Sequence, residues 1–399
     1  NRISKVKKNR DSALIYTYLF RALGDWAFRF AVPLFLYAKT NSALGTALGY
    51  ILTFLPQVLF AIPAGVMADR YDKRTLLWLL DLVGFASCLI LAFQVHHQAP
   101  ISTIYTMIFV ISSIGTFYHA VFQGSIPIAI GKQRLHWANS MVNAGDSLLS
   151  ALGPIIGALA VVVLGYEFVI YLNAFSYLVA VIVTLRCIHF VSIQVRNVHV
   201  GHMLKEGAKA ISRDDFLKFG VLLFMANNFA MFLYLGVFVY HLKHNFGLSD
   251  LAVGAVCSVG GAAAIAGSFM AKNILDERIG ALKKISILAI LLGVATLFMA
   301  INQPVFFSVA WAMVNFVDAL IMVTYFTERQ IRVPGELLGR VVSFSRMVAY
   351  AAIPLGAGVG ALAVGYFSIP SVIIVSGILM TIFGASSVLF CRYYPEHAL

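Results

Sequence analysis

The sequence predicts an all-α membrane protein with twelve transmembrane helices. Of its 399 residues, 60% are hydrophobic and only 12% are charged, a balance that excludes an ordinary soluble domain. Twelve apolar segments follow one another along the chain, each near the ~20 residues that a helix needs to cross a bilayer. They run over roughly 13–38, 45–68, 75–95, 101–126, 147–165, 168–188, 216–240, 249–271, 285–302, 304–327, 340–366 and 369–391.

The basic residues predict the orientation of these spans. With the N-terminus in the cytoplasm, 24 of the 29 Lys and Arg residues fall on the cytoplasmic side, two on the other side (Lys39 and Lys243) and three within spans. Cytoplasmic loops carry such an excess of basic residues, so we expect both termini in the cytoplasm and an even number of spans. The basic stretch 2–10 precedes a span that is too long and too charged for a signal peptide, and we interpret it as part of a retained first helix.

The same distribution argues against other classes of protein. The net charge of +12 is spread over many short loops, without the compact basic patch of a nucleic-acid-binding protein. The four cysteines, Cys88, Cys187, Cys257 and Cys391, lack metal-ligand or redox spacing. No hydrolase or phosphate-cradling motif is present in the sequence. We therefore expect no enzyme activity, no metal site and no cofactor.

The chain divides into two halves that repeat. The longest loop separates six spans from six, which predicts an N-terminal bundle (1–188), a cytoplasmic linker (189–215) and a C-terminal bundle (216–399). Within the linker, the stretch 203–212 has the pattern of an amphipathic helix on the membrane surface. Pro154 in span five corresponds to Pro354 in span eleven. Two pseudo-symmetric six-helix bundles around a central site are typical of a transporter.

Span one carries three charges on one face. Arg21, Asp25 and Arg29 are spaced i, i+4, i+8, with Asp25 close to the middle of the bilayer. An intramembrane ionisable residue is by default a functional hypothesis: Asp25 would line a cavity and bind a proton or a cationic group. The alternative is a structural Arg–Asp–Arg ladder. Two flanking arginines favour the ionised carboxylate, so easy protonation would require one arginine to move away.

A charged turn joins spans two and three. Residues 65–77 read GVMADRYDKRTLL, and so many charges must lie at a membrane face. We expect Gly65 to allow close approach of a neighbouring helix and Asp69 to meet a helix N-terminus. The pattern resembles the signature cytoplasmic loop of the major facilitator superfamily, with Asp72 where many members have glycine. The resemblance implies a conformational switch formed by Gly65, Asp69, Arg70, Arg74 and the Asp81 carboxylate within span three.

Two further motifs narrow this resemblance. Gly153, Pro154 and Gly157 resemble the Gly-Pro-x-x-Gly element in span five of proton-coupled drug exporters, where it seals one side of the pathway. Ordinary small-residue packing is the alternative interpretation of these residues. The segment 334–341 resembles Pro-x-x-x-x-Gly-Arg-Val before span eleven of the branch that includes macrolide efflux proteins and enterobactin exporters.

Other polar residues lie within the remaining spans. Asp146 begins predicted span five, where we interpret it as a helix cap. Asp318 and Arg346 lie in the cytoplasmic halves of spans ten and eleven, where they either face a cavity or form a buried pair. The remaining candidates for a cavity or for interhelical hydrogen bonds are Asn173, Asn227, Asn228 and Asn315.

The resemblance implies a monomeric secondary exporter in a bacterial plasma membrane, driven by protons and acting on amphipathic small molecules such as drugs or siderophores. A divalent metal exporter resembling bacterial ferroportins, which also carry Gly-Asp in span one, is an alternative, although Asn227 and Asn228 are the only further ligands we find for it. A non-transporting membrane sensor or scaffold is a third hypothesis. It would require an added soluble domain, and we identify none in the sequence.

Overall fold

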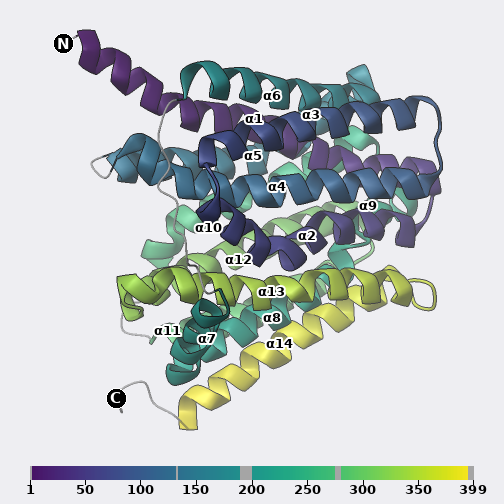
Figure 1. Ribbon diagram of the computed structural model, residues 1–399. Coiled ribbons are helices and arrows are strands. Elements are labelled where there is room, and N and C mark those ends of the chain that lie inside the picture. The colour runs from purple at the N-terminus through teal and green to yellow at the C-terminus, as the bar shows by residue number, and fades with distance from the viewer. Residues whose placement is uncertain (1, 132–133, 189–199, 275–279, 394–399) are drawn as a thin grey trace. The chain divides into compact units, whose positions relative to one another are not determined.

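The computed structural model describes residues 2–131, 134–188, 200–274 and 280–393. Within these ranges the chain is helical, with short connections (Figure 1). Its elements are α1 (Arg2–Thr40), α2 (Ala43–Arg70), α3 (Lys73–His96), α4 (Ile101–Ile130), α5 (Leu135–Leu164), α6 (Tyr166–Cys187), α7 (Val200–Arg213), α8 (Asp215–Leu235), α9 (Phe238–Tyr240), the π-helix η2 (His241–Asn245), α10 (Asp250–Ile274), α11 (Ala281–Phe298), α12 (Pro304–Arg332), α13 (Gly335–Ala363) and α14 (Ile369–Tyr393).

The predicted all-α, multi-spanning class is confirmed. Among the described residues, 11 helices are long and apolar enough to cross a membrane. The helix of the predicted first span, α1, is not among them, and it carries the Arg21, Asp25 and Arg29 charges. Most predicted spans match a helix within a few residues, but α5 begins at Leu135 rather than at 147. Apolar length alone places the start of this span at 147, because hydropathy detects the apolar part of a helix and not its polar extension.

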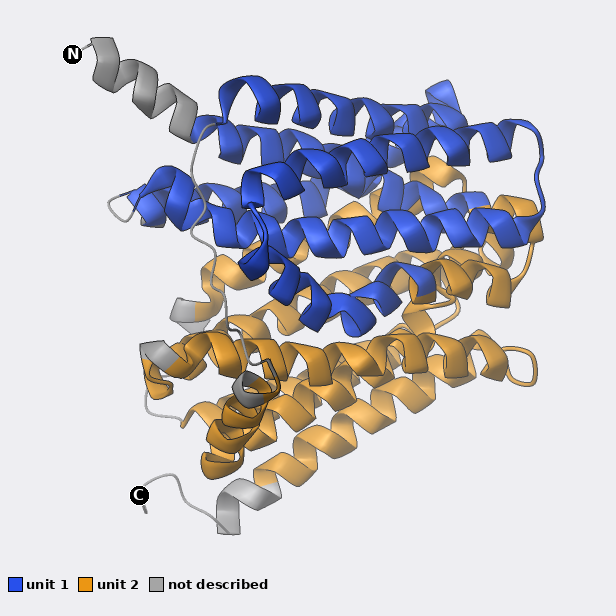
Figure 2. Cartoon of the chain, in the orientation of Figure 1, with its two compact units in different colours: residues 1–35, 52–200 blue, residues 36–51, 201–399 orange. Residues whose placement is uncertain are grey.

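The structure divides into two compact units (Figure 2). Unit 1 comprises Asn1–Phe35 and Leu52–Val200, and unit 2 comprises Leu36–Ile51 and Gly201–Leu399. The amphipathic stretch 203–212 lies within α7, in unit 2. Residues 189–199 of the predicted linker lie outside the described residues, so the division into two bundles at that linker stays a prediction.

Unit 1 has an aromatic and aliphatic core between α1, α3, α4 and α5. In this unit α3 packs against both α4 and α6. The core includes Leu14, Tyr18, Leu77 and Phe122, all buried, and the rings of Tyr18 and Phe122 stack with their centroids 4.0 Å apart. These contacts hold α1 against its neighbours along the segment that carries the charges.

Glycines set the distance between α5 and α1. A Cβ atom on Gly153 would lie 3.1 Å from the Trp26 Cβ, and one on Gly157 would lie 3.2 Å from the Ala27 carbonyl oxygen. Pro154 lies between them, inside the helix. The small residues predicted to allow close packing of span five therefore do so here against α1, as small residues do in membrane interfaces.

Unit 2 contains a second glycine seam, between α13 and α8. Cβ atoms on Gly356 and Gly360 would overlap the backbone carbonyl groups of Phe229 and Leu233, respectively. Gly358, between them, would place its Cβ 3.8 Å from the nearest heavy atom, on Ile51. Two of these three glycines are therefore required by contact with a neighbouring helix.

This seam gives a matched stability prediction. We expect Gly360→Ala to lower stability by ~1–3 kcal/mol, because the overlap is with backbone and must displace a helix. Gly358→Ala should be neutral or slightly stabilising, since alanine favours the helix and meets no close atom. Thermal unfolding of the purified proteins in detergent measures both effects. Equal melting temperatures would show that Gly360 is not needed for close contact between α13 and α8.

Candidate functional site: a buried Arg21–Asp25–Asp81 triad and its pocket

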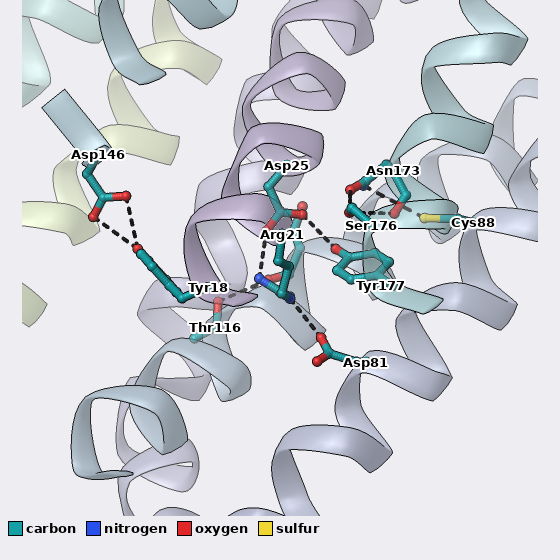
Figure 3. Close-up of polar contacts among 11 residues, drawn as sticks. Tyr18, Arg21, Asp25, Asp81, Cys88, Thr116, Asp146, Asn173, Ser176 and Tyr177 are labelled. Atoms are coloured by element: carbon teal, nitrogen blue, oxygen red, sulfur yellow. Dashed lines mark hydrogen bonds and ion pairs between the residues drawn. The ribbon is translucent and has the colours of Figure 1, made fainter. Parts of the chain in front are cut away.

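Arg21 on α1 joins two carboxylates from two helices (Figure 3). Its Nη1 donates to the Asp25 Oδ2 at 2.7 Å, one turn along the same helix, and its Nε donates to the Asp81 Oδ1 of α3 at 2.8 Å. The Tyr177 hydroxyl of α6 donates to the other Asp25 oxygen at 2.7 Å. We call Arg21, Asp25 and Asp81 the triad.

The triad is buried, but not uniformly. The side chains of Arg21 and Asp81 are 4% and 0% exposed, whereas that of Asp25 is 17% exposed. The guanidinium carbon of Arg21 lies 3.8 Å from the ring centre of Tyr118 and 4.7 Å from that of Tyr177, so both ring faces stabilise its charge. Desolvated charges persist only when paired in this way.

The third charge of α1 lies outside the triad. Among the described residues, Arg29 forms no ion pair with Asp25: its guanidinium lies 5.9 Å from the Trp26 ring centre, and it interacts electrostatically with Asp146. The predicted three-membered ladder on α1 is therefore wrong at Arg29. The second carboxylate that pairs with Arg21 is instead Asp81 of α3, a residue that the resemblance to the superfamily assigns to the conformational switch.

Asp25 and Arg29 line a pocket within unit 1. Thr53 of α2 and several residues of α4 complete its walls. The full lining is Asp25, Phe28, Arg29, Val32, Thr53, Ile111, Ser112 and Gly115. Four of these eight residues are polar or charged, and the free space inside is about 20 Å³, room for about one water molecule. In this conformation the pocket therefore admits a small polar group and not a whole amphipathic molecule.

Asp146 does not cap a helix, and that prediction is wrong. It lies well inside α5, and its two carboxylate oxygens accept from the Tyr18 hydroxyl at 3.0 and 2.9 Å. Tyr18 lies one turn before Arg21 on α1, so a second carboxylate–tyrosine contact joins α5 to the charged segment of α1.

Several predicted cavity residues instead bond between or within helices. Asn173 is fully buried and contacts the Cys88 sulfur at 3.8 Å. Asn228 of α8 donates to the Ala349 carbonyl of α13 at 2.9 Å, and Asn315 donates to the Trp311 carbonyl of its own helix. Asn227 is buried. None of the four lines the pocket at Asp25.

Asp318 and Arg346 do not form the predicted buried pair. Among the described residues no ion pair joins them, and the Arg346 guanidinium lies 5.2 Å from the ring centre of Tyr350, one turn along α13. The other interpretation, a role facing a cavity, stays a prediction for both.

The charged turn between α2 and α3 forms local contacts. The Asp72 side chain caps α3 by accepting from the Thr75 N–H at 2.8 Å, which explains how a carboxylate serves where a glycine is usual. Arg74 donates to the Leu185 carbonyl near the end of α6 at 2.8 Å. A Cβ on Gly65 would meet no heavy atom within 4 Å, so the predicted close approach at Gly65 is wrong in this structure.

Comparison with known proteins assigns the family. The chain matches the Major Facilitator Superfamily over residues 14–327 and again over 219–398. The chain belongs to the major facilitator superfamily. It is therefore a multi-pass membrane secondary transporter and not an enzyme.

Curated relatives of this superfamily member match only in part. Macrolide efflux protein A of Streptococcus pyogenes is 26% identical over 131 residues, which is 32% of this chain and 32% of that protein. The same protein from serotype M6 (strain ATCC BAA-946 / MGAS10394) gives the same values. The match spans about a third of the length of these relatives.

Solved structures of transporters share the fold over nearly the whole chain. A bacterial homologue of the iron transporter ferroportin, in an inward-facing state, has a TM-score of 0.70 at 14% identity and covers 95% of this chain and 98% of that chain. The POT family transporter PepTSo gives 0.76 at 11% identity (98% and 99%), and the nucleoside transporter NupG gives 0.74 at 13% (96% and 99%). At such identities the likeness establishes the fold alone.

Sequence reasoning missed the tyrosines of this superfamily member's charged network. Tyr18, Tyr118 and Tyr177 each contact a triad residue or Asp146. The sequence has 17 tyrosines, and nothing local distinguishes these three. Spacing along α1 identified Arg21 and Asp25, but the tyrosine partners come from other helices.

Proposed function

We propose that this transporter is a proton-coupled exporter of amphipathic small molecules, with both termini in the cytoplasm of a bacterial cell. The observation that carries the proposal is the dual position of Asp25, which belongs to the buried triad and also lines a small pocket of mixed polar and apolar residues. A charged substrate group in that pocket would compete for the carboxylate that holds Arg21. The partial likeness to macrolide efflux protein A supports export and this class of substrate.

The mechanism follows from alternating access, in which two helix bundles expose a site to each side of the membrane in turn. Asp25 contacts the substrate and, as a member of the triad, takes part in binding the driving proton, and Arg29 sets the charge of the pocket wall. The close contact of Gly153 and Gly157 with α1 transmits movement of α1 to α5.

Transport assays test the proposal. Everted membrane vesicles energised to an inside-acid state should accumulate a macrolide, and the macrolide should partly dissipate the proton gradient. Vesicles in which Asp25 and Arg29 are both replaced by alanine serve as the control. Accumulation that is insensitive to collapse of the proton gradient would contradict proton coupling, and its absence with macrolides and siderophores alike would contradict the substrate class.

Cysteine labelling tests the orientation. In a variant whose native cysteines are replaced by serine or alanine, single cysteines at Lys39 or Lys243 should react with an impermeant reagent in intact cells. Cysteines at Arg70 or Lys205 should react only after the membrane is opened. Labelling of the Lys205 position from outside would reverse the proposed orientation.

The charged turn is proposed to control conformational switching and not binding. We expect Asp69→Asn to slow transport by about tenfold or more while substrate affinity stays within a few-fold of wild type, because Asp69 does not line the Asp25 pocket. Binding by the purified protein and transport by proteoliposomes give the two values. Loss of binding in a folded variant would refute this division of roles.

A further inference from the structure

The charges of the triad do not balance. Two carboxylates share one guanidinium, so the fully ionised triad carries one excess negative charge in a site where Arg21 and Asp81 are almost completely buried. Such an uncompensated buried charge costs several kcal/mol. We propose that the triad binds one exchangeable proton and that Asp81 carries it in the conformation described.

Hydrogen bonding distinguishes the two carboxyl groups. Both oxygens of Asp25 accept hydrogen bonds, one from Arg21 and one from Tyr177, and donors of this kind favour the ionised form. Asp81 accepts from Arg21 through Oδ1 only, and its Oδ2 is buried without a partner among the described atoms. An unpaired buried oxygen is less costly on a neutral carboxyl than on a carboxylate, so the proton belongs on the Asp81 Oδ2.

No further cation contacts the triad among the described residues. Tyr118 of α4 and Tyr177 of α6 lie against Arg21 as neutral rings, and the Cys88 thiol lies two turns beyond Asp81 on α3. Tyr18, one turn before Arg21, is bonded to Asp146. Arg29 interacts with that same Asp146. The proton is therefore the remaining source of the missing positive charge.

The position of Asp81 couples proton release to movement. Its side chain is 0% exposed, so the proton can leave only when α1 and α3 separate enough to admit water. On release the O–H electrons stay on Asp81, the proton passes to water, and the triad is left with an excess negative charge. A cationic group bound at Asp25 would restore neutrality. This step rests on the proposed function and narrows the substrate class to amphipathic cations, each exchanged for one proton.

Infrared difference spectroscopy on the purified full-length protein tests the proton without requiring transport. The C=O stretch of a protonated carboxyl is the readout. Asp81→Asn and Asp25→Asn should each lose one such band relative to wild type. In each variant a single carboxylate remains beside Arg21, and their charges cancel without a bound proton. Arg21→Gln should gain a band, since both carboxyls must then be neutral. Arg29→Gln, the matched control on the same helix, should leave the band assigned to the triad unchanged, because Arg29 interacts with Asp146 instead.

A second variant locates the proton. Tyr177→Phe removes only the hydroxyl that donates to Asp25, so the band should keep its frequency if Asp81 carries the proton. A frequency shift in Tyr177→Phe would move the proton to Asp25 and overturn its assignment to Asp81. Unchanged bands in both asparagine variants would show that the triad binds no proton.

The same variants separate this inference from the proposed export function. Asparagine has the shape and charge of a protonated Asp81, so Asp81→Asn should fold normally, bind an amphipathic cation such as tetraphenylphosphonium with affinity independent of pH, and lose uphill export. If Asp81→Asn fails to fold while Asp25→Asn folds, the protonated state assigned to Asp81 is contradicted. If Asp81→Asn loses the infrared band but keeps pH-driven export, then the wild-type triad does bind a proton, but that proton does not drive export.

Discussion

Arg21→Gln is expected to be the most destabilising single substitution in the charged segment of α1. The change removes the partner of two carboxylates, of which Asp81 is fully buried. Removing one member of a buried ion pair costs about 3–5 kcal/mol. Here the cost arises because neither carboxyl keeps a cationic partner, so both must bind a proton for the protein to fold. Thermal unfolding in detergent should show a large drop in melting temperature and a low yield of folded protein.

The pH dependence of Arg21→Gln provides the internal check. The folded variant holds both carboxyls neutral, whereas the unfolded chain ionises them near their ordinary values of about 3.9. The folded state therefore binds more protons than the unfolded state, and stability falls as the pH rises. Arg29→Gln, the matched control, should cost much less at any pH, because Arg29 pairs with neither triad carboxylate. Equal losses of stability in the two variants would show that the buried ion pairs of the triad stabilise the fold no more than an arginine outside it.

The spans could be predicted because apolar length is a local property of the chain. A run of about twenty apolar residues indicates a membrane-crossing helix, whichever helices pack against it. The polar turns of α5 before 147 carry no such signal, so apolar length alone places Asp146 at the start of the span, where a carboxylate would cap the helix. In the structure it lies inside the helix and bonds to Tyr18, 128 residues away in sequence.

The pairing of the charges could not be predicted in the same way. Helical spacing places Arg21 and Asp25 one turn apart, and their ion pair follows. The same spacing places Arg29 equally close to Asp25, but spacing says nothing of Asp81, which is 60 residues away and competes for Arg21. Which arginine a carboxylate selects depends on the helices packed around it, and those contacts are non-local.

The structure also changes what Asp25→Asn is expected to do. If only α1 is considered, the asparagine would leave the positive charges of Arg21 and Arg29 without a nearby negative charge in a low-dielectric site. Because Arg21 also pairs with Asp81 at 2.8 Å, the variant keeps a neutral Arg21–Asp81 pair and should fold. The loss should instead appear in transport. We expect uphill export to fall by at least about a hundredfold, while exchange down a substrate gradient continues. The Arg21–Asp81 pair is then neutral without a proton, and the asparagine at position 25 attracts no cation.

Proteoliposomes with an imposed pH gradient measure both activities of Asp25→Asn. The matched variant is Arg29→Gln, which alters the same pocket wall without removing a carboxylate; its substrate affinity should change, but the export that remains should still depend on the pH gradient. If the folded Asp25→Asn variant still exports against a gradient in a pH-dependent way, Asp25 is not required for coupling. The triad, together with Tyr177, would then only hold α1, α3 and α6 against one another, and Asp318 of α12 would be the next carboxylate to replace.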